Sequence, residues 1–125
     1  MDLEEFRDYC LSKIAASESM PFGEGILVFK VAGKLFALAA LDEIPATVNL
    51  KCNPDLALAL RDQYDQVQPG YHMNKKHWNT VEIDSGIPDA ELRKMIDHSY
   101  ELIVQGLPKK TREKLRRSRG MQNLA

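Results

Sequence analysis

The sequence predicts an α+β domain, a two-layer sandwich in which helices pack on one face of an antiparallel sheet. Three short apolar segments between residues 26 and 51 are joined by short turns, which is typical of antiparallel strands. Segments on both sides of them show the three- and four-residue apolar spacing of amphipathic helices. The chain has 125 residues, the size of one domain, so we expect a single domain over 1–125 with a basic tail over 107–125.

The first element is predicted to be a helix over residues 2–18. Its acidic first turn suits the positive end of the helix dipole, and a proline and two glycines at 21–25 end it. Its apolar face has helical spacing and consists of Leu3, Phe6, Cys10 and Ile14.

A β-hairpin is predicted next. Residues 26–31 are rich in β-branched and aromatic side chains, Ala32 and Gly33 suit a tight turn, and residues 34–40 form the returning strand. The alanines in 34–40 are also compatible with a helix, but the length and the preceding strand and turn favour the hairpin. A third short strand is predicted at 47–51.

Asn53 and Pro54 predict the start of a second helix, because asparagine caps helices well and proline suits the first helical position. Leu56, Leu60 and Tyr64 recur at four-residue steps and are the expected inner face of this helix. The apolar spacing of these side chains predicts that they pack against the sheet.

After a turn at Pro69-Gly70, residues 78–83 are predicted to form a strand in which Val81 and Ile83 share one face. A long helix then begins at Pro88 and ends at Gly106. Its expected inward face has helical spacing and consists of Leu92, Ile96, Ser99, Tyr100 and Ile103.

The charge is unevenly distributed along the chain. The net charge is −1, but residues 107–125 carry seven basic residues and one acidic residue, whereas residues 1–106 carry ten basic and seventeen acidic residues. The tail is predicted either to continue as a short helix whose basic face binds a polyanion or to be a frayed, solubilising end.

Common catalytic motifs are absent from the sequence: it has no P-loop, no dinucleotide-binding glycine motif and no nucleophile elbow. His72 and His77 are five residues apart in a predicted loop, and His98 lies on a predicted helix beside Asp97, where adjacent side chains diverge. The acidic residues near the N-terminus are interpreted as a solvated helix face rather than an iron site. We therefore expect no enzymatic activity, no metal and no cofactor.

Cys10 and Cys52 are far apart in the sequence and are interpreted as buried thiols rather than a disulfide or a zinc site. The acidic N-terminus lacks the features of a signal peptide, and the longest apolar run, Leu35 to Leu41, is too short to span a bilayer. A cytoplasmic location without membrane association is expected.

Residues 69–78 combine the side chains that nucleic-acid contact requires. Cations neutralise phosphates, amides reach base edges and aromatic rings stack on bases. In the alternative interpretation Tyr71 and Trp78 are core anchors flanked by solvated lysines. The polar and basic candidates in the segment are Asn74, Lys75, Lys76 and His77.

Three blocks of the sequence resemble the MmcQ/YjbR-like family. They are the opening Pro21-Phe22-Gly23 with 28–37, the central signature over 69–81, and the closing 99–103 with Leu107-Pro108-Lys109-Lys110. The blocks occur in family order, and the resemblance covers roughly residues 1–115.

The resemblance implies a bacterial cytoplasmic protein with a CyaY-like (frataxin-like) sandwich, no catalytic residues and no cofactor. It also implies DNA binding through a double-wing arrangement of β-hairpins, so the expected partner is double-stranded DNA. The alternative is a protein-interaction module with a protein partner. An iron-handling role would follow from the frataxin-like fold alone, and a monomer is favoured over an oligomer.

Candidate nucleic-acid-binding residues lie in two segments that the double-wing resemblance would make wings, with the basic side chains expected to contact phosphates and Asn74 a base edge. They are Lys30 and Lys34 around the first hairpin, and Asn74, Lys75, Lys76 and His77 in the central signature. If DNA is the partner, these lysines should form one continuous basic face; if they lie on opposite sides, a protein partner is favoured.

Overall fold

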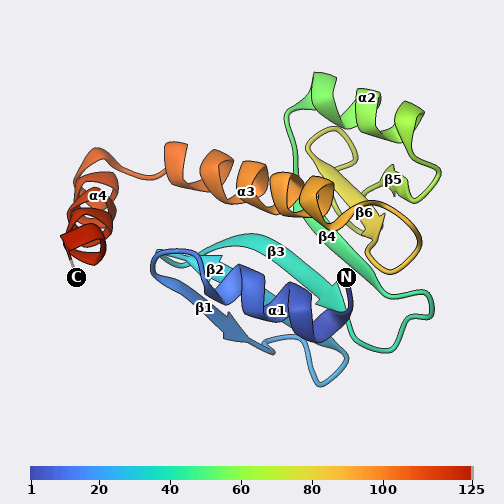
Figure 1. Cartoon of the computed structure of the whole chain (residues 1–125), viewed down its shortest axis with the longest axis horizontal. Coiled ribbons are helices and arrows are strands. Elements are labelled where there is room, and N and C mark those ends of the chain that lie inside the picture. Colours follow the sequence, from blue (N-terminus) through green and yellow to red (C-terminus); the bar gives the residue numbers. More distant parts are fainter. Residues whose placement is uncertain (125) are drawn as a thin grey trace.

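The computed structural model describes residues 1–124 and the side chains of residues 1–118. Figure 1 shows the elements in chain order. The helices are α1 (Leu3–Leu11), α2 (Pro54–Gln63), α3 (Asp89–Gln105) and α4 (Lys109–Leu124). The strands are β1 (Ala16–Ser19), β2 (Ile26–Val31), β3 (Lys34–Ala40), β4 (Thr47–Lys51), β5 (Val67–Pro69) and β6 (Trp78–Glu82).

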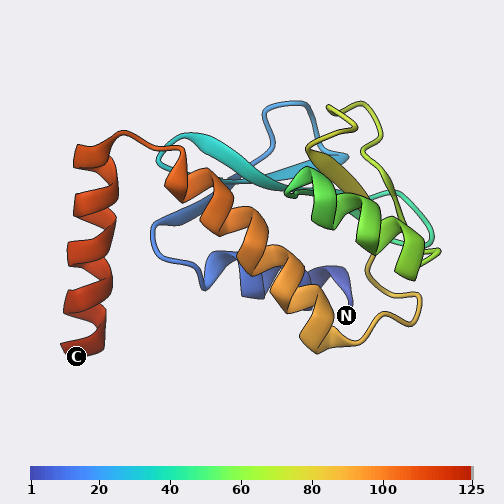
Figure 2. The same cartoon turned by 90° about the horizontal axis from the view of Figure 1, so that it is seen from above.

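The six strands form one open antiparallel sheet in the order β1-β2-β3-β4-β6-β5. Helices α1, α2 and α3 pack on one side of it, and we call the opposite side the open face (Figure 2). Helix α3 crosses β3 and β4, whereas α2 lies against β5. The predicted α+β class, with helices packed against an antiparallel sheet, is confirmed.

The core between helices and sheet is organised by a row of aromatic rings. Phe6 of α1 meets Phe29 edge-on at 5.7 Å between ring centroids, and Phe36 meets Tyr100 of α3 edge-on at 5.3 Å. A β-bulge makes this possible, because Phe29 pairs with Ala37 while the next residue, Lys30, pairs with Leu35. Phe36 is the extra residue, so Phe36 and Ala37 are both fully buried.

The predicted helix over 2–18 is wrong beyond Leu11, where α1 ends. Ala15 has a positive φ of 60°, which no helix continues, and the chain then enters β1. Strand β1 pairs with β2 from Ala16 opposite Val31 to Ser19 opposite Val28. Pairing with β2 gives hydrogen bonds to the backbone amides and carbonyls of β1. The apolar spacing of the sequence alone assigns these residues to the helix.

The predicted hairpin is confirmed, as is the third strand at 47–51. Ala32 and Gly33 have φ values of 50° and 78°, the two positive values that a type I′ hairpin turn requires. Strand β5 was not predicted; it contains three residues and pairs with β6 from Val67 opposite Val81 to Pro69 opposite Asn79. The strand predicted at 78–83 is observed as β6, which ends at Glu82.

Helix α2 begins at Pro54 as predicted, and the Asn53 side chain accepts hydrogen bonds from the amides of residues 55 and 56. Its predicted inner face is confirmed at Leu60 and Tyr64, which pack against the core, but Leu56 is 41 % exposed and Ala57 is the buried residue. The short side chain of Ala57 lets α2 approach the sheet closely. Leu56, by contrast, is turned away from the buried side of the helix.

The long helix α3 also agrees with its prediction, with Leu92, Ile96, Ser99 and Tyr100 buried. The tail after Leu107 is helical: α4 spans Lys109–Leu124, and its Leu115 packs against the core.

Candidate nucleic-acid interface

The antiparallel register brings two basic connections to the same end of the sheet. The turn at Ala32-Gly33 joins β2 to β3, and the loop 70–77 joins β5 to β6. Because β4 runs antiparallel to both β3 and β6, Lys51 ends β4 beside Trp78, the first residue of β6. Lysines of β2, β3, β4 and the loop therefore gather at one end of the sheet, which we call the basic end: Lys30, Lys34, Lys51, Lys75 and Lys76.

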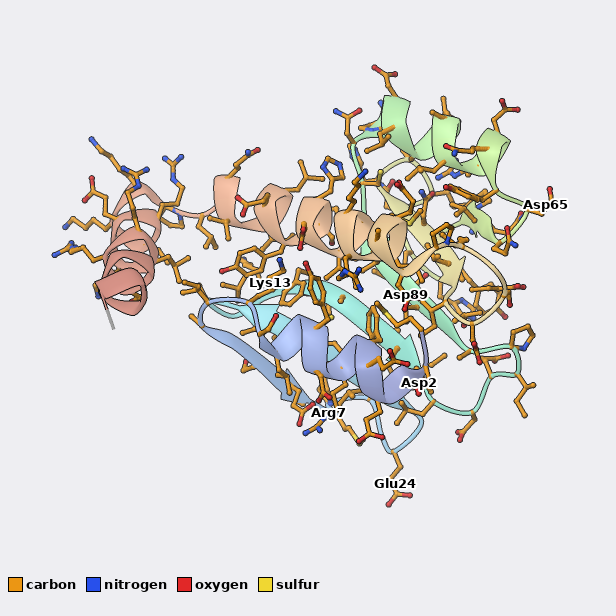
Figure 3. All side chains as sticks on the ribbon, in the orientation of Figure 1. Asp2, Arg7, Lys13, Glu24, Asp65 and Asp89 are labelled. Carbon is orange, nitrogen blue, oxygen red and sulfur yellow. The ribbon has the colours of Figure 1, made fainter. Side chains whose placement is uncertain are left out.

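The opposite end of the sheet is acidic. Its connections are the loops between β1 and β2, between β3 and β4, and after β6, and they contain no lysine or arginine. Figure 3 shows Glu24 and Asp65 on the side of the molecule away from α4, whose nitrogen-tipped side chains project on the other side. The acidic residues of this end are Glu24, Asp42, Glu43, Asp65, Glu82 and Asp84.

The loop 70–77 is closed by backbone contacts at its neck. The amide of Gly70 donates to the carbonyl of Trp78 at 2.9 Å, and a Cβ added at Gly70 would lie 2.9 Å from the Trp78 Cβ. The carboxamide oxygen of Asn74 accepts from the amides of Lys76 at 2.9 Å and His77 at 3.2 Å. The loop is thus an ordered turn that needs a glycine at its neck and an asparagine at its tip.

Arg61 of α2 holds this loop from the helix side. Its Nε donates to Oδ1 of Asn79 at 2.8 Å, and its Nη2 donates to the carbonyl of Trp78 at 3.3 Å and to that of Lys75. Sequence reasoning missed Arg61, because an arginine in the last turn of a helix has no local signal for a loop 14 residues away. Arg61 is consequently a structural residue whose guanidinium is already engaged, rather than a cation available to a ligand.

The lysines of the predicted site have different surroundings. Lys34 and Lys76 are exposed, whereas Lys30 is half-buried on the open face, where it pairs with Leu35 and Ser17 of the neighbouring strands. Lys75 is exposed too, but its Nζ donates to the carbonyl of Gly70 at 2.9 Å and so supports the loop. Lys34 and Lys76 are therefore the most available cations of the predicted set.

Asn74 and His77 contribute mainly to holding the loop in shape. The carboxamide oxygen of Asn74 is occupied by the two backbone amides. His77 is half-buried, and its carbonyl accepts from the amide of Cys52 at 2.8 Å, which joins the loop to the end of β4. Lys51, which sequence reasoning did not select, adds a half-buried lysine to the open face.

The interpretation of Tyr71 as a core anchor is wrong. Tyr71 is 68 % exposed and lies against His72, with 4.0 Å between ring centroids, while Trp78 is half-buried. Phe22, in the loop between β1 and β2, is 70 % exposed. Both loops project beyond the open face (Figure 2), so each presents an aromatic ring to solvent.

Asp97 and His98 diverge, as expected for adjacent helical residues. Asp97 binds Lys13 of the α1–β1 connection and accepts from the Tyr9 hydroxyl at 2.7 Å. His98 accepts through Nε2 from the amide of Asn53 at 3.1 Å, and burial lowers its pKa. The two side chains stabilise different contacts and form no proton relay.

The two cysteines are free and buried. Burial raises the pKa of both thiols, that of Cys52 to about 11, which suppresses the reactive thiolate. Among the described residues, no group of three or more histidine, cysteine or acidic side chains is placed to hold a metal ion. The described helices include none that is long and apolar enough to cross a membrane.

Comparison with known proteins places this arrangement in a family. The profile of the YjbR family matches residues 11–102. The chain is 36 % identical to the uncharacterized protein YjbR of Escherichia coli K12 over 115 residues, covering 92 % of this chain and 98 % of that protein. It is 42 % identical to the uncharacterized protein YbdF of Escherichia coli O157:H7 over 97 residues, covering 77 % and 79 % of the two chains.

Solved structures agree. The crystal structure of a Deinococcus radiodurans protein with a DUF419 domain superposes with a TM-score of 0.85 at 33 % identity, over 90 % of this chain and 86 % of the other. A Pseudomonas syringae crystal structure gives a TM-score of 0.72 at 28 % identity, over 82 % and 98 %. With its sequence and its six-stranded sheet both matching, this chain belongs to the YjbR family.

Proposed function

We propose that this chain is a non-enzymatic DNA-binding module that holds the phosphate backbone with the lysines of its basic end. The observation that carries the proposal is the separation of charge along the strands, with Lys34 and Lys76 exposed at one end of the sheet and acidic residues gathered at the other. Because the net charge is −1, a polyanion would approach the basic end more favourably than the acidic end.

Both basic segments are hairpin tips. The turn at Ala32-Gly33 closes the β2–β3 hairpin, and the loop 70–77 closes the β5–β6 hairpin. Three strand spacings of about 4.8 Å separate β2 from β6, so the two tips lie on the order of 14 Å apart. That separation lets two tips contact phosphates on one duplex, which is what a pair of wings requires.

The helix α4 extends the positive surface. It stands on the same side of the molecule as the β2–β3 turn (Figures 1 and 2), and its described part carries six basic residues and one acidic residue. These cations would add sequence-independent phosphate contacts. The basic residues are Lys109, Lys110, Arg112, Lys114, Arg116 and Arg117.

Fluorescence anisotropy with a labelled duplex tests the proposal. The parent chain should bind at low salt, and the logarithm of its affinity should fall linearly with the logarithm of the salt concentration. Lys34→Glu with Lys76→Glu should weaken binding and reduce the salt slope by about 2, because two phosphate contacts are removed. Lys75 is left intact, since its ammonium supports the loop.

The matched control is Arg93→Glu with Lys94→Glu, which makes the same change of charge on α3, on the helix side of the sheet and not at a hairpin tip. Both double variants should keep the far-ultraviolet circular dichroism of the parent. Equal losses of affinity in the two variants would show a net-charge effect alone, and no duplex binding by the parent at low salt would end the proposal.

A protein-interaction module is the second candidate, and the exposed rings favour it. Phe22 and Tyr71 project from two loops on either side of the open face, where a flat protein surface could contact both. A protein partner would remain bound after nuclease treatment and would be lost with Phe22→Ser. DNA binding through the basic end should not respond to Phe22→Ser.

A further inference from the structure

A cavity of about 170 Å³ lies on the helix side of the sheet, between α2 and α3. Its floor is formed by β4 and β6, and its walls come from the facing sides of the two helices. Its apolar lining is Leu50, Leu56, Leu60, Val81 and Met95, with Cys52 beside them. Protein interiors contain few voids larger than a water molecule, so a space of this size calls for an explanation.

The cavity exists because α2 rests on the sheet through a small side chain. Ala57 is the residue of α2 that is fully buried, and Leu56 is 41 % exposed at the cavity mouth. Leu58, on the outer side of the helix, is 61 % exposed and does not line the cavity. A molecule entering between α2 and α3 would bury Leu56 without any rearrangement of the core.

One polar group of the floor lacks a partner. Asn79 is 2 % exposed, and its Oδ1 accepts from Nε of Arg61, which fixes the orientation of the carboxamide. Its Nδ2 donates no hydrogen bond to another described residue. Asn79 lines the cavity, so an acceptor oxygen supplied by a ligand there would accept a hydrogen bond from this amide nitrogen.

Further hydrogen-bond donors lie at the mouth of the cavity. His98 accepts a backbone hydrogen bond through Nε2, so the neutral ring carries its proton on Nδ1 and is a second donor. Lys94 lines the mouth as well; it is 73 % exposed and lies 3.2 Å from Glu91. The walls are apolar, whereas the polar lining has the donors of Asn79 and His98, two lysines, Lys51 and Lys94, and one carboxylate, Glu91, which is paired with Lys94.

We infer that this cavity binds a small carboxylic acid with an apolar body, of about the size of benzoate. An engineered apolar cavity of about 150 Å³ in another protein accepts benzene, so a single ring fits the volume. The ring would contact the leucines and Val81, and the carboxylate would accept from Asn79 and the donors at the mouth. This inference can be tested separately from DNA binding, because Lys51 is the one lysine of the basic end that lines the cavity, whereas Lys34 and Lys76 do not.

Nuclear magnetic resonance titration of the full chain with benzoate is the first test. Signals of Leu50, Leu60 and Val81 should shift saturably below about 10 mM, the range expected for a fragment of this size. Leu60→Trp fills the cavity and should abolish the shifts, whereas Leu58→Trp on the outer side of α2 should preserve them. No saturable shift in the parent chain would overturn the inference.

Benzylamine tests the chemical class of the ligand, because it has the same ring with a cationic group. Benzylamine should bind at least tenfold more weakly than benzoate, so at equal concentration it should saturate the shifts far less. Equal binding of benzylamine and benzoate would contradict the assignment of a carboxylate, since the donors at the floor and mouth would then have no role.

Thiol alkylation tests the location without any variant. Cys52 lines the cavity, whereas Cys10 is on the buried side of α1 and does not line it, so the chain carries its own control. Benzoate should slow iodoacetamide labelling of Cys52 several-fold and leave the rate at Cys10 unchanged, as followed by mass spectrometry of the two peptides. No slowing at Cys52 would rule out occupation of this cavity.

Discussion

Nε of Arg61 lies 2.8 Å from Oδ1 of Asn79, and this hydrogen bond joins the two features on which function is proposed here. The same guanidinium binds the carbonyls of Lys75 and Trp78, so Arg61 holds the loop of the β5–β6 hairpin. Asn79 in turn lies on the floor of the cavity between α2 and α3. One arginine therefore positions both the basic loop and the unpaired amide of the cavity.

Replacing Arg61 with alanine should lower the free energy of unfolding by about 1.5–3 kcal/mol, because a charge-assisted hydrogen bond is lost and Oδ1 of buried Asn79 is left unpaired. Arg93→Ala is the matched control, since Arg93 is exposed on α3. Urea denaturation measures both. Equal stability of the two variants would mean that Arg61 does not hold the loop in solution.

Ser99 of α3 should be similarly important inside the core. It is fully buried, its Oγ donates to the carbonyl of Phe36 in the bulge, and it accepts from the amide of Lys51 at 2.9 Å. Ser99→Ala leaves both backbone groups without this partner and should cost about 1–3 kcal/mol in the free energy of unfolding. Thermal and urea denaturation against Ser118→Ala, an exposed helical serine, checks this, and a difference near zero would contradict it.

Ala32→Gly should stabilise the protein. Ala32 has a φ of 50°, where an L side chain is strained, and glycine removes that strain at the cost of some chain entropy. The net gain should be about 0.5–1 kcal/mol in the free energy of unfolding. Ala59→Gly, the same change in the exposed interior of α2, should instead cost about 1 kcal/mol. The same sign at both positions would refute the turn geometry.

Stability should depend on the titration of His98. Burial lowers the pKa of His98 below its ordinary value of 6.5. The unfolded chain therefore takes up a proton first, so this contribution is fully present above pH 6.5 and is lost as the pH falls below it. Protonation also removes the acceptor of the Asn53 amide at Nε2.

The measurement is the free energy of unfolding at pH 8 and pH 5. His98→Gln should reduce the loss between these pH values, because the titrating group is gone. His72→Gln, at an exposed histidine of the loop 70–77, should behave like the parent. An unchanged pH dependence in His98→Gln would show that other groups are responsible.

Local signals predicted most elements because those signals act over a few residues. Asn53 and Pro54 start α2, and Ala32-Gly33 turns the hairpin, whatever the rest of the chain does. Strands β1 and β5 were missed because they have four and three residues and form only by pairing with β2 and β6. Helical spacing continued past Leu11 in the sequence, yet edge pairing with β2 determined the structure there.

The candidate site was predicted in part for the same reason. The lysines could be named from composition, and the register then placed them with Lys51 at one end of the sheet. Tyr71 could not be assigned correctly, because whether a ring in a loop is buried depends on what packs against that loop. Arg61 reaches the loop from α2, and no spacing in the sequence indicates such a contact.

By itself, the sequence determined the family signature, the α+β class, the hairpin, α2 with its Asn53 cap, the long helix α3 and the chemical identity of the basic residues. The tertiary structure alone decided that basic and acidic connections separate to opposite ends of the sheet, because strand direction and pairing order are non-local properties. It also decided that α2 rests on Ala57 and leaves a cavity beside α3, because packing distance depends on which side chains meet.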